Sequence, residues 1–154
     1  VPAPSLGDPR APRLAAALTT VVLAVALLTG NVWVLLAQTA VFALGVRDRS
    51  PYAVLFRRAV RPRLGPPAEL EDSRPLRFAQ ALGLAFAVTA LVGVAVGVPA
   101  LTLVAVAAAL AAAFLNAAFG VCLGCEVYLL LRRSPIARYT PTTPTPSSRP
   151  EVPA

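Results

Sequence analysis

Four apolar segments constrain the fold of this chain more than any other feature. They cover residues 14–29, 32–46, 78–98 and 100–131. Because 57% of the 154 residues are hydrophobic and only 14% are charged, against about a quarter in a soluble domain, much of this apolar surface has to face lipid. A segment inside a bilayer must satisfy its own backbone hydrogen bonds, so helix is the expected state of all four. The sequence therefore predicts one small all-α membrane domain.

The positions of the arginines predict how these helices are oriented. All fourteen basic residues are arginine: two precede the first segment, eight lie in the loop 47–77 and four follow the fourth segment. The short connections at 30–31 and 97–99 carry no charge. Since cytoplasmic loops are enriched in Lys and Arg, we expect four transmembrane helices in two tandem hairpins, with both termini and the basic loop in the cytoplasm. This distribution also argues against nucleic acid as a partner, despite the net charge of +7.

An internal repeat supports the tandem arrangement. Asp8–Leu18 aligns with Asp72–Leu82, with the Asp, both Arg, two Ala and the final Leu identical. The sequence YAVLFRR from Tyr52 likewise resembles YLLLRR from Tyr128. We interpret the chain as two hairpins of the same orientation, related by an axis along the membrane normal. Parallel repeats of this kind occur in transporters, and they also arise from plain duplication of a hairpin, which is the explanation we favour.

The segments outside the helices have distinct compositions. The N-terminal segment 1–13 is predicted to be cytoplasmic, the transmembrane domain to cover 14–133, and the Pro/Thr/Ser-rich tail 134–154 to be disordered. In the loop 47–77, Pro51–Arg58 alternates apolar and cationic groups and predicts a short interfacial helix. The loop's arginines are expected to contact anionic lipid headgroups or to dock a soluble partner; they are Arg47, Arg49, Arg57, Arg58, Arg61 and Arg63.

The only two cysteines, Cys122 and Cys125, form a Cys-x-x-Cys pair in the last apolar segment. On a helix, residues three apart share a face, so both thiols point the same way and can share a disulfide, a sulfur atom or a soft metal. Nearby cations stabilise a reactive thiolate, and Arg132 and Arg133 follow in sequence. Glu126 is a candidate for tuning protonation. We assign Cys122, Cys125 and Glu126 as the candidate catalytic residues.

The depth of this pair depends on where the last helix ends. The 32 residues of 100–131 span about 48 Å as one helix, more than the hydrocarbon core of roughly 30 Å. Either the helix tilts, or it breaks at Gly120 or Gly124 and leaves the pair at the cytoplasmic interface. The repeat favours the break, because the charged stretch 47–51 precedes the matching Tyr52. In a reducing cytoplasm we expect the resting pair to be a dithiol.

Other interpretations of the polar residues stay open. The two cysteines can simply pack as small apolar residues or bind a soft metal such as Cu(I). A closed zinc site needs four ligands, and the sequence has no His, so only a homo-oligomer completes one; no cofactor is expected. Gln38 and Asn116 are expected to form hydrogen bonds between helices or to line a substrate path. Glu126 is either a functional intramembrane charge or reaches water beside Arg132.

Three motifs carry a resemblance to a known family. They are SPYAVLFRRAVRPRLGPP, EDSRPLRFAQALG and AAFLNAAFGVCLGCEVYLLLRR. On these, the chain resembles, from Asp8 to Arg133, a bacterial membrane family catalogued as domain of unknown function 4395. The resemblance implies a four-helix protein of the bacterial cytoplasmic membrane with a Cys-x-x-Cys near its end. Relatives occur beside thioredoxin-like and sulfurtransferase proteins, which implies thiol or sulfane-sulfur handling.

The sequence and the resemblance together predict a function. Cys122 and Cys125 are expected to exchange electrons or a persulfide with a cytoplasmic thioredoxin-like or sulfurtransferase protein, through a mixed disulfide. The alternative is a non-catalytic assembly component, or a transporter of small solutes or soft metals, in which the cysteines only pack or bind the metal.

Overall fold

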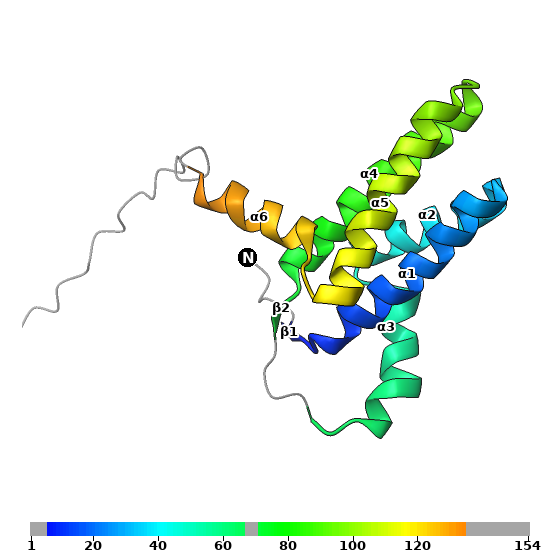
Figure 1. Ribbon diagram of the computed structural model, residues 1–154. Helices are drawn as coiled ribbons and strands as arrows, with labels where there is room; N and C mark the ends of the chain where they lie inside the picture. Colours follow the sequence, from blue (N-terminus) through cyan, green and yellow to red (C-terminus); the bar gives the residue numbers. More distant parts are fainter. Residues whose placement is uncertain (1–5, 67–70, 135–154) are drawn as a thin grey trace, which may run out of the picture.

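The computed structural model describes residues 6–66 and 71–134, and within them the chain is helical apart from one pair of two-residue strands (Figure 1). The tail from residue 135 on, predicted to be disordered, lies outside the described residues. The elements in chain order are β1 (Leu6–Gly7), α1 (Arg10–Thr29), α2 (Val32–Val46), α3 (Pro51–Leu55), a π-helical turn (Phe56–Val60), a 3-10 turn (Arg61–Arg63), β2 (Glu71–Asp72), α4 (Arg74–Ala95), α5 (Pro99–Phe119) and α6 (Leu123–Arg133).

Three of the helices, α1, α4 and α5, are long and apolar enough to cross a membrane. Only 17% of the most apolar stretch of α4, and of α5, is buried against the rest of the protein, and 28% of that of α1. Apolar side chains such as Leu28 and Phe119 are 87% and 72% exposed, which is far more than a soluble surface tolerates over whole helices. These helices indicate a membrane protein. α2 is apolar but shorter, with 15 residues and a length of about 22 Å.

The long helices pack as two pairs, α1 with α2 and α4 with α5, and each pair also contacts the other. α1 lies against α5 and α2 lies against α4, so the core forms where the pairs cross; it contains Leu23, Leu35, Ala90 and Val106. Small residues in this core, such as Ala90, allow the helix backbones to approach each other closely. The pairs diverge at the ends where α1 meets α2 and α4 meets α5 (Figure 1). An apolar groove of about 600 Å³ lies between those ends.

The repeat seen in the sequence is also a structural repeat. Each half begins with a strand and an aspartate, and the Asp8 and Asp72 carboxylates each accept a hydrogen bond from the backbone N–H two residues later, both at 2.9 Å. The two strands pair antiparallel, with Leu6 opposite Asp72. The short helix that ends each half packs on the first helix of the same half, α3 on α1 and α6 on α4.

The predicted helical segment 100–131 is not one helix, because the chain breaks at Gly120, as the repeat favoured. α5 ends at Phe119, and Gly120 adopts the left-handed conformation with φ of 70° while its N–H donates to the carbonyl of Asn116. Glycine has no Cβ and adopts this conformation without steric cost, which makes it the usual helix terminator. The break was one of the two alternatives that the sequence left open, and it separates α6 from the long apolar helix.

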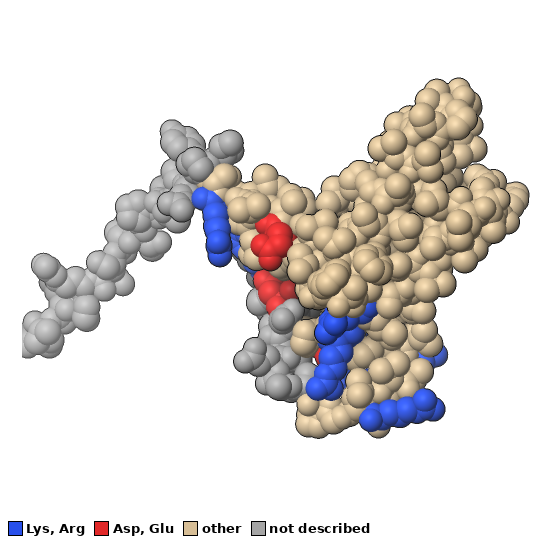
Figure 2. Space-filling model, viewed as in Figure 1, with Lys and Arg blue, Asp and Glu red and all other residues tan. Residues whose placement is uncertain are grey.

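The basic loop contains the predicted helix. It is α3, which continues into the π-helical turn and buries Phe56 to 2% exposure. In the view of Figure 2, charged side chains lie around α3, α6 and the strands, whereas the diverging ends of the helix pairs carry none. The six predicted headgroup-contacting arginines are all exposed: Arg47, Arg49, Arg57, Arg58, Arg61 and Arg63.

Candidate functional site

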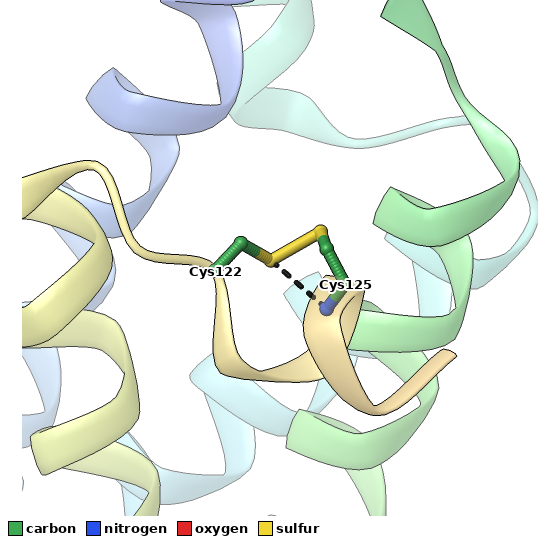
Figure 3. The surroundings of a disulfide bond; sticks show 2 residues. All are labelled: Cys122 and Cys125. Atoms are coloured by element: carbon green, nitrogen blue, oxygen red, sulfur yellow. Dashed lines mark hydrogen bonds between the residues drawn. A yellow bond between two sulfur atoms is a disulfide. The ribbon is translucent and has the colours of Figure 1, made fainter. Parts of the chain in front are cut away.

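A disulfide between Cys122 and Cys125 lies at the start of α6, with the two Cα atoms 5.2 Å apart (Figure 3). Cys122 is the N-cap of the helix, and its Sγ accepts a hydrogen bond of 3.3 Å from the N–H of Cys125. This is the contact that a Ser or Asp side chain makes at an ordinary N-cap. The sulfurs lie on the same side, as their spacing indicated. The structure has the pair in its oxidised form; a dithiol as the resting state in the cytoplasm stays a prediction.

α4 fixes the position of this disulfide through a close helix contact. Gly124 is buried, and a Cβ added there would lie 2.7 Å from both Cα and Cβ of Ala79. Only glycine therefore allows the first turn of α6 to sit at this distance from α4. One turn later the rings of Tyr128 and Phe78 are in contact, with centroids 5.7 Å apart. Both cysteines remain half-buried, so the disulfide is packed on one side and open on the other.

The electrostatic environment differs from the one predicted. Arg132 and Arg133 lie in the last turn of α6, about 15 Å along the helix from Cys122, and the Arg132 guanidinium lies 5.8 Å from the Tyr128 ring centroid. The group that faces Cys122 is the N-terminus of α6, whose partial positive charge favours a thiolate. Glu126 is exposed in the first turn of α6 and is not part of a long apolar helix.

Sequence reasoning missed Arg13 as a cation near the pair. A Cβ placed on Gly120 would lie 4.0 Å from the Arg13 Nε, so this side chain reaches the turn two residues before Cys122. The equivalent residue in the other half, Arg77, donates to the carbonyl of Val46 at 3.2 Å and forms an ion pair of 3.4 Å with Asp48. The repeat itself contained this signal, because Arg13 and Arg77 are aligned.

A cavity of about 90 Å³ borders Cys122 and is lined by residues of α1, α2, α4 and α5. Its polar lining consists of Thr19, Gln80 and Asn116. Gln38 forms the predicted hydrogen bond between helices, since its Nε2 donates to Thr19 Oγ1 at 3.4 Å. The hydroxyl of Tyr52 on α3 donates to Gln38 Oε1 at 2.9 Å. Asn116, predicted to act similarly, borders the cavity instead.

Partial burial has a consequence for Tyr52, which lies outside the long helices. It raises the pKa of the Tyr52 phenol above its ordinary value by desolvation. The neutral phenol is the form that donates to Gln38.

In residues 6–66 and 71–134, no group of three or more His, Cys, Asp or Glu side chains is placed to hold a metal ion.

Comparison with known proteins gives one match. The family model described as a domain of unknown function, DUF4395, matches residues 8–133. No curated protein and no solved structure matches the chain. The matched region extends from Asp8, at the start of the first repeat, to the end of α6 and includes the disulfide. Because the match covers most of its length, the chain belongs to the DUF4395 family.

Proposed function

We propose that the protein is a membrane thiol–disulfide exchange protein whose reactive centre is the Cys122–Cys125 pair. The observation that carries the proposal is that Cys122 caps α6 while bonded to Cys125, with both residues half-buried. A disulfide that only packed the core has no need of a helix N-terminus, whereas a reactive pair gains a stabilised thiolate there.

The exchange follows ordinary disulfide chemistry. A thiolate of the partner attacks Sγ of Cys122, a mixed disulfide forms, and Cys125 leaves as a thiolate. A second thiol of the partner then attacks the mixed disulfide and releases Cys122, whose thiolate is stabilised by the N–H groups of α6. With a partner persulfide as the attacking group, a trisulfide forms and Cys125 leaves as a thiolate. Attack by the second partner thiol on the partner's own sulfur then forms the partner disulfide and leaves the outer sulfur on Cys122 as a persulfide. The expected partner is a thioredoxin-like or sulfurtransferase protein of the cytoplasm.

The proposed topology places this centre at the cytoplasmic surface of a bacterial membrane. The arginines gather at the end of the molecule that carries α3 and α6 (Figure 2), and arginine-rich segments face the cytoplasm. In this arrangement α2 is a fourth span, and the bilayer thins around it to match its length. α6 lies along the interface, with Leu130 and Leu131 in the lipid and Arg132 at the headgroups.

Trapping of the mixed disulfide tests the exchange. Because the exchange is reversible, the Cys122 thiolate of a Cys125→Ser variant attacks the disulfide of an oxidised partner in cells, and the variant lacks the Cys125 thiol that would resolve the adduct. We expect it to accumulate a disulfide-linked complex with a cytoplasmic thiol protein, and the complex to dissociate on reduction. Cys122→Ser is the matched control and should trap nothing.

The non-catalytic alternative predicts that no mixed disulfide is trapped. If neither variant traps a partner and both behave as the unmodified protein, then the cysteines only pack or bind a soft metal. Maleimide labelling of the reduced thiols from one side of the membrane tests the topology separately: labelling only after permeabilisation supports a cytoplasmic site, and labelling of intact cells contradicts it.

A further inference from the structure

Only one of the two cysteines lines the cavity beside the disulfide. Cys122 lines it and Cys125 does not. Its volume of about 90 Å³ exceeds the roughly 10–15 Å³ that a single water requires, so it has room for a molecule of a few heavy atoms. None of its lining residues is charged. Since an unpaired charge is costly to bury, the cavity favours a small uncharged molecule over a peptide or an ionised thiol compound.

A difference between the two halves of the protein helps to create this space. Ala16 of α1 occupies the repeat position of Gln80 in α4. The Gln80 side chain fills the contact with α2, since a Cβ on Gly45 would lie 2.7 Å from its Oε1. At the related contact of α1 with α5, alanine leaves the corresponding volume empty. Ala16 lines the cavity, opposite Ala109 and Ala113 of α5.

The polar groups of the cavity offer both donors and acceptors. Gln38 donates to Thr19 Oγ1 and is itself held by Tyr52, which leaves the Thr19 hydroxyl proton free to donate into the cavity. Asn116 borders the same space, and within the described part of the chain its side-chain amide has no hydrogen-bond partner. An occupant that satisfies them needs donors and acceptors on adjacent atoms.

We infer that this cavity binds a small hydroperoxide, hydrogen peroxide above all, next to a reduced Cys122. The inference rests on the proposed function and adds the oxidant to it. Hydrogen peroxide is uncharged and small, and each of its oxygens both donates and accepts a hydrogen bond. It is also the kind of molecule that a stabilised thiolate reduces.

The reaction balances with the groups present. The Cys122 thiolate attacks one peroxide oxygen, an S–O bond forms, the O–O bond breaks, and hydroxide leaves and takes a proton to become water. The Cys125 thiol then attacks the sulfenic sulfur of Cys122, the S–S bond forms, and the S–O oxygen leaves as a second water with the thiol proton. Two thiols and one peroxide give the disulfide and two waters. The protein partner of the proposed function supplies the electrons that regenerate the dithiol.

The test measures disulfide formation by the full-length reduced protein in detergent micelles. We expect hydrogen peroxide to react about 100-fold faster than cumene hydroperoxide, which is too large for the cavity. Asn116→Leu removes the amide at nearly constant volume and should slow the peroxide reaction about tenfold. Ala16→Leu fills the cavity and should slow it further, whereas Ala17→Leu, on the exposed face of the same turn, should have no effect. Oxidation by a soluble aromatic disulfide reports on general thiol reactivity and should be the same in all four proteins.

The outcomes separate this inference from the proposed function. If the unmodified protein oxidises no faster with hydrogen peroxide than with cumene hydroperoxide, the cavity is not a peroxide site, whatever the variants do. The exchange proposal then stands or falls on the Cys125→Ser adduct alone. If peroxide selectivity is present but unchanged by Asn116→Leu and Ala16→Leu, the peroxide reacts from the open side of the disulfide and the inference is wrong.

Discussion

Replacement of Gly124 by alanine is the most direct test of how α6 holds the disulfide in place. The added Cβ would lie 2.7 Å from Cα and Cβ of Ala79, whereas carbon atoms in contact ordinarily lie about 3.5–4.0 Å apart. α6 therefore has to move by about 1 Å from α4. The backbone Cα of Ala79 has no side-chain rotamer through which to yield, so the whole first turn of α6 moves and carries both cysteines with it.

The cost follows from overpacking. Inserting one methyl group into a tight contact costs about 1–3 kcal/mol, which shifts the balance between docked and undocked α6 about 5- to 150-fold. Undocking exposes the packed side of the disulfide. We therefore expect Gly124→Ala to increase the rate at which the oxidised pair is reduced by dithiothreitol, by up to that factor, with smaller effects on the melting temperature of the long helices.

A matched control is available in the same chain. Gly65 has no neighbour within 4 Å of an added Cβ and no left-handed backbone, so Gly65→Ala should leave the reduction rate unchanged. Adding Ala79→Gly to Gly124→Ala removes one of the two close contacts and should restore the rate in part. Equal reduction rates for Gly124→Ala and Gly65→Ala would show that α6 is not held by this contact, and the account of the site would have to change.

Three further predictions concern the polar groups around the site. Burial raises the pKa of the Tyr52 phenol. The neutral phenol therefore contributes to stability at pH values below its ordinary pKa of about 10, and this contribution is lost as the pH rises through the pKa of the folded state. Tyr52→Phe should reduce this loss of stability in unfolding measured between about pH 9 and 12. Gln38→Leu removes two hydrogen bonds and should destabilise the protein by about 1–2 kcal/mol, seen in denaturant unfolding. Arg13→Gln should move the pH profile of Cys122 alkylation toward higher pH, because it removes a nearby cation, while Arg77→Gln should weaken the fold and leave that profile unchanged.

The helical class and the approximate extents of the long helices are predictable from sequence because they depend on local hydropathy. An excess of length and the backbone freedom of glycine also indicate a break at Gly120 or Gly124, and the structure places it at Gly120. The short helix around Pro51 is predictable from its alternation of apolar and cationic groups. These features need no knowledge of which helices touch.

The arrangement around the disulfide was less accessible because it depends on tertiary contacts. That Cys122 caps a helix became visible only once the start of α6 was known. That Gly124 meets Ala79 depends on how α6 crosses α4. Arg132 and Arg133 are near Cys125 in sequence, but the cysteines lie at the start of α6 and the arginines in its last turn.

Aligned side chains make different contacts in the two halves of the protein. In one half, Arg77 bonds to the end of α2 and pairs with Asp48, and Gln80 fills the space over Gly45. Both side chains have a structural purpose. In the other half, the aligned Arg13 lies at the Gly120 turn, where glycine offers no carboxylate.

The Gln80 side chain is packed against α2, whereas the aligned Ala16 lines the cavity. Packing alone explains Arg77 and Gln80, and it gives no reason for a cation and a cavity at the equivalent positions. The cavity borders Cys122, and Arg13 reaches the turn two residues before it; Cys122 has no counterpart in the first half of the chain. Among the described residues, the aligned positions therefore hold a cation paired with a carboxylate and a packed glutamine in one half, and a cation at a glycine turn and a cavity beside Cys122 in the other.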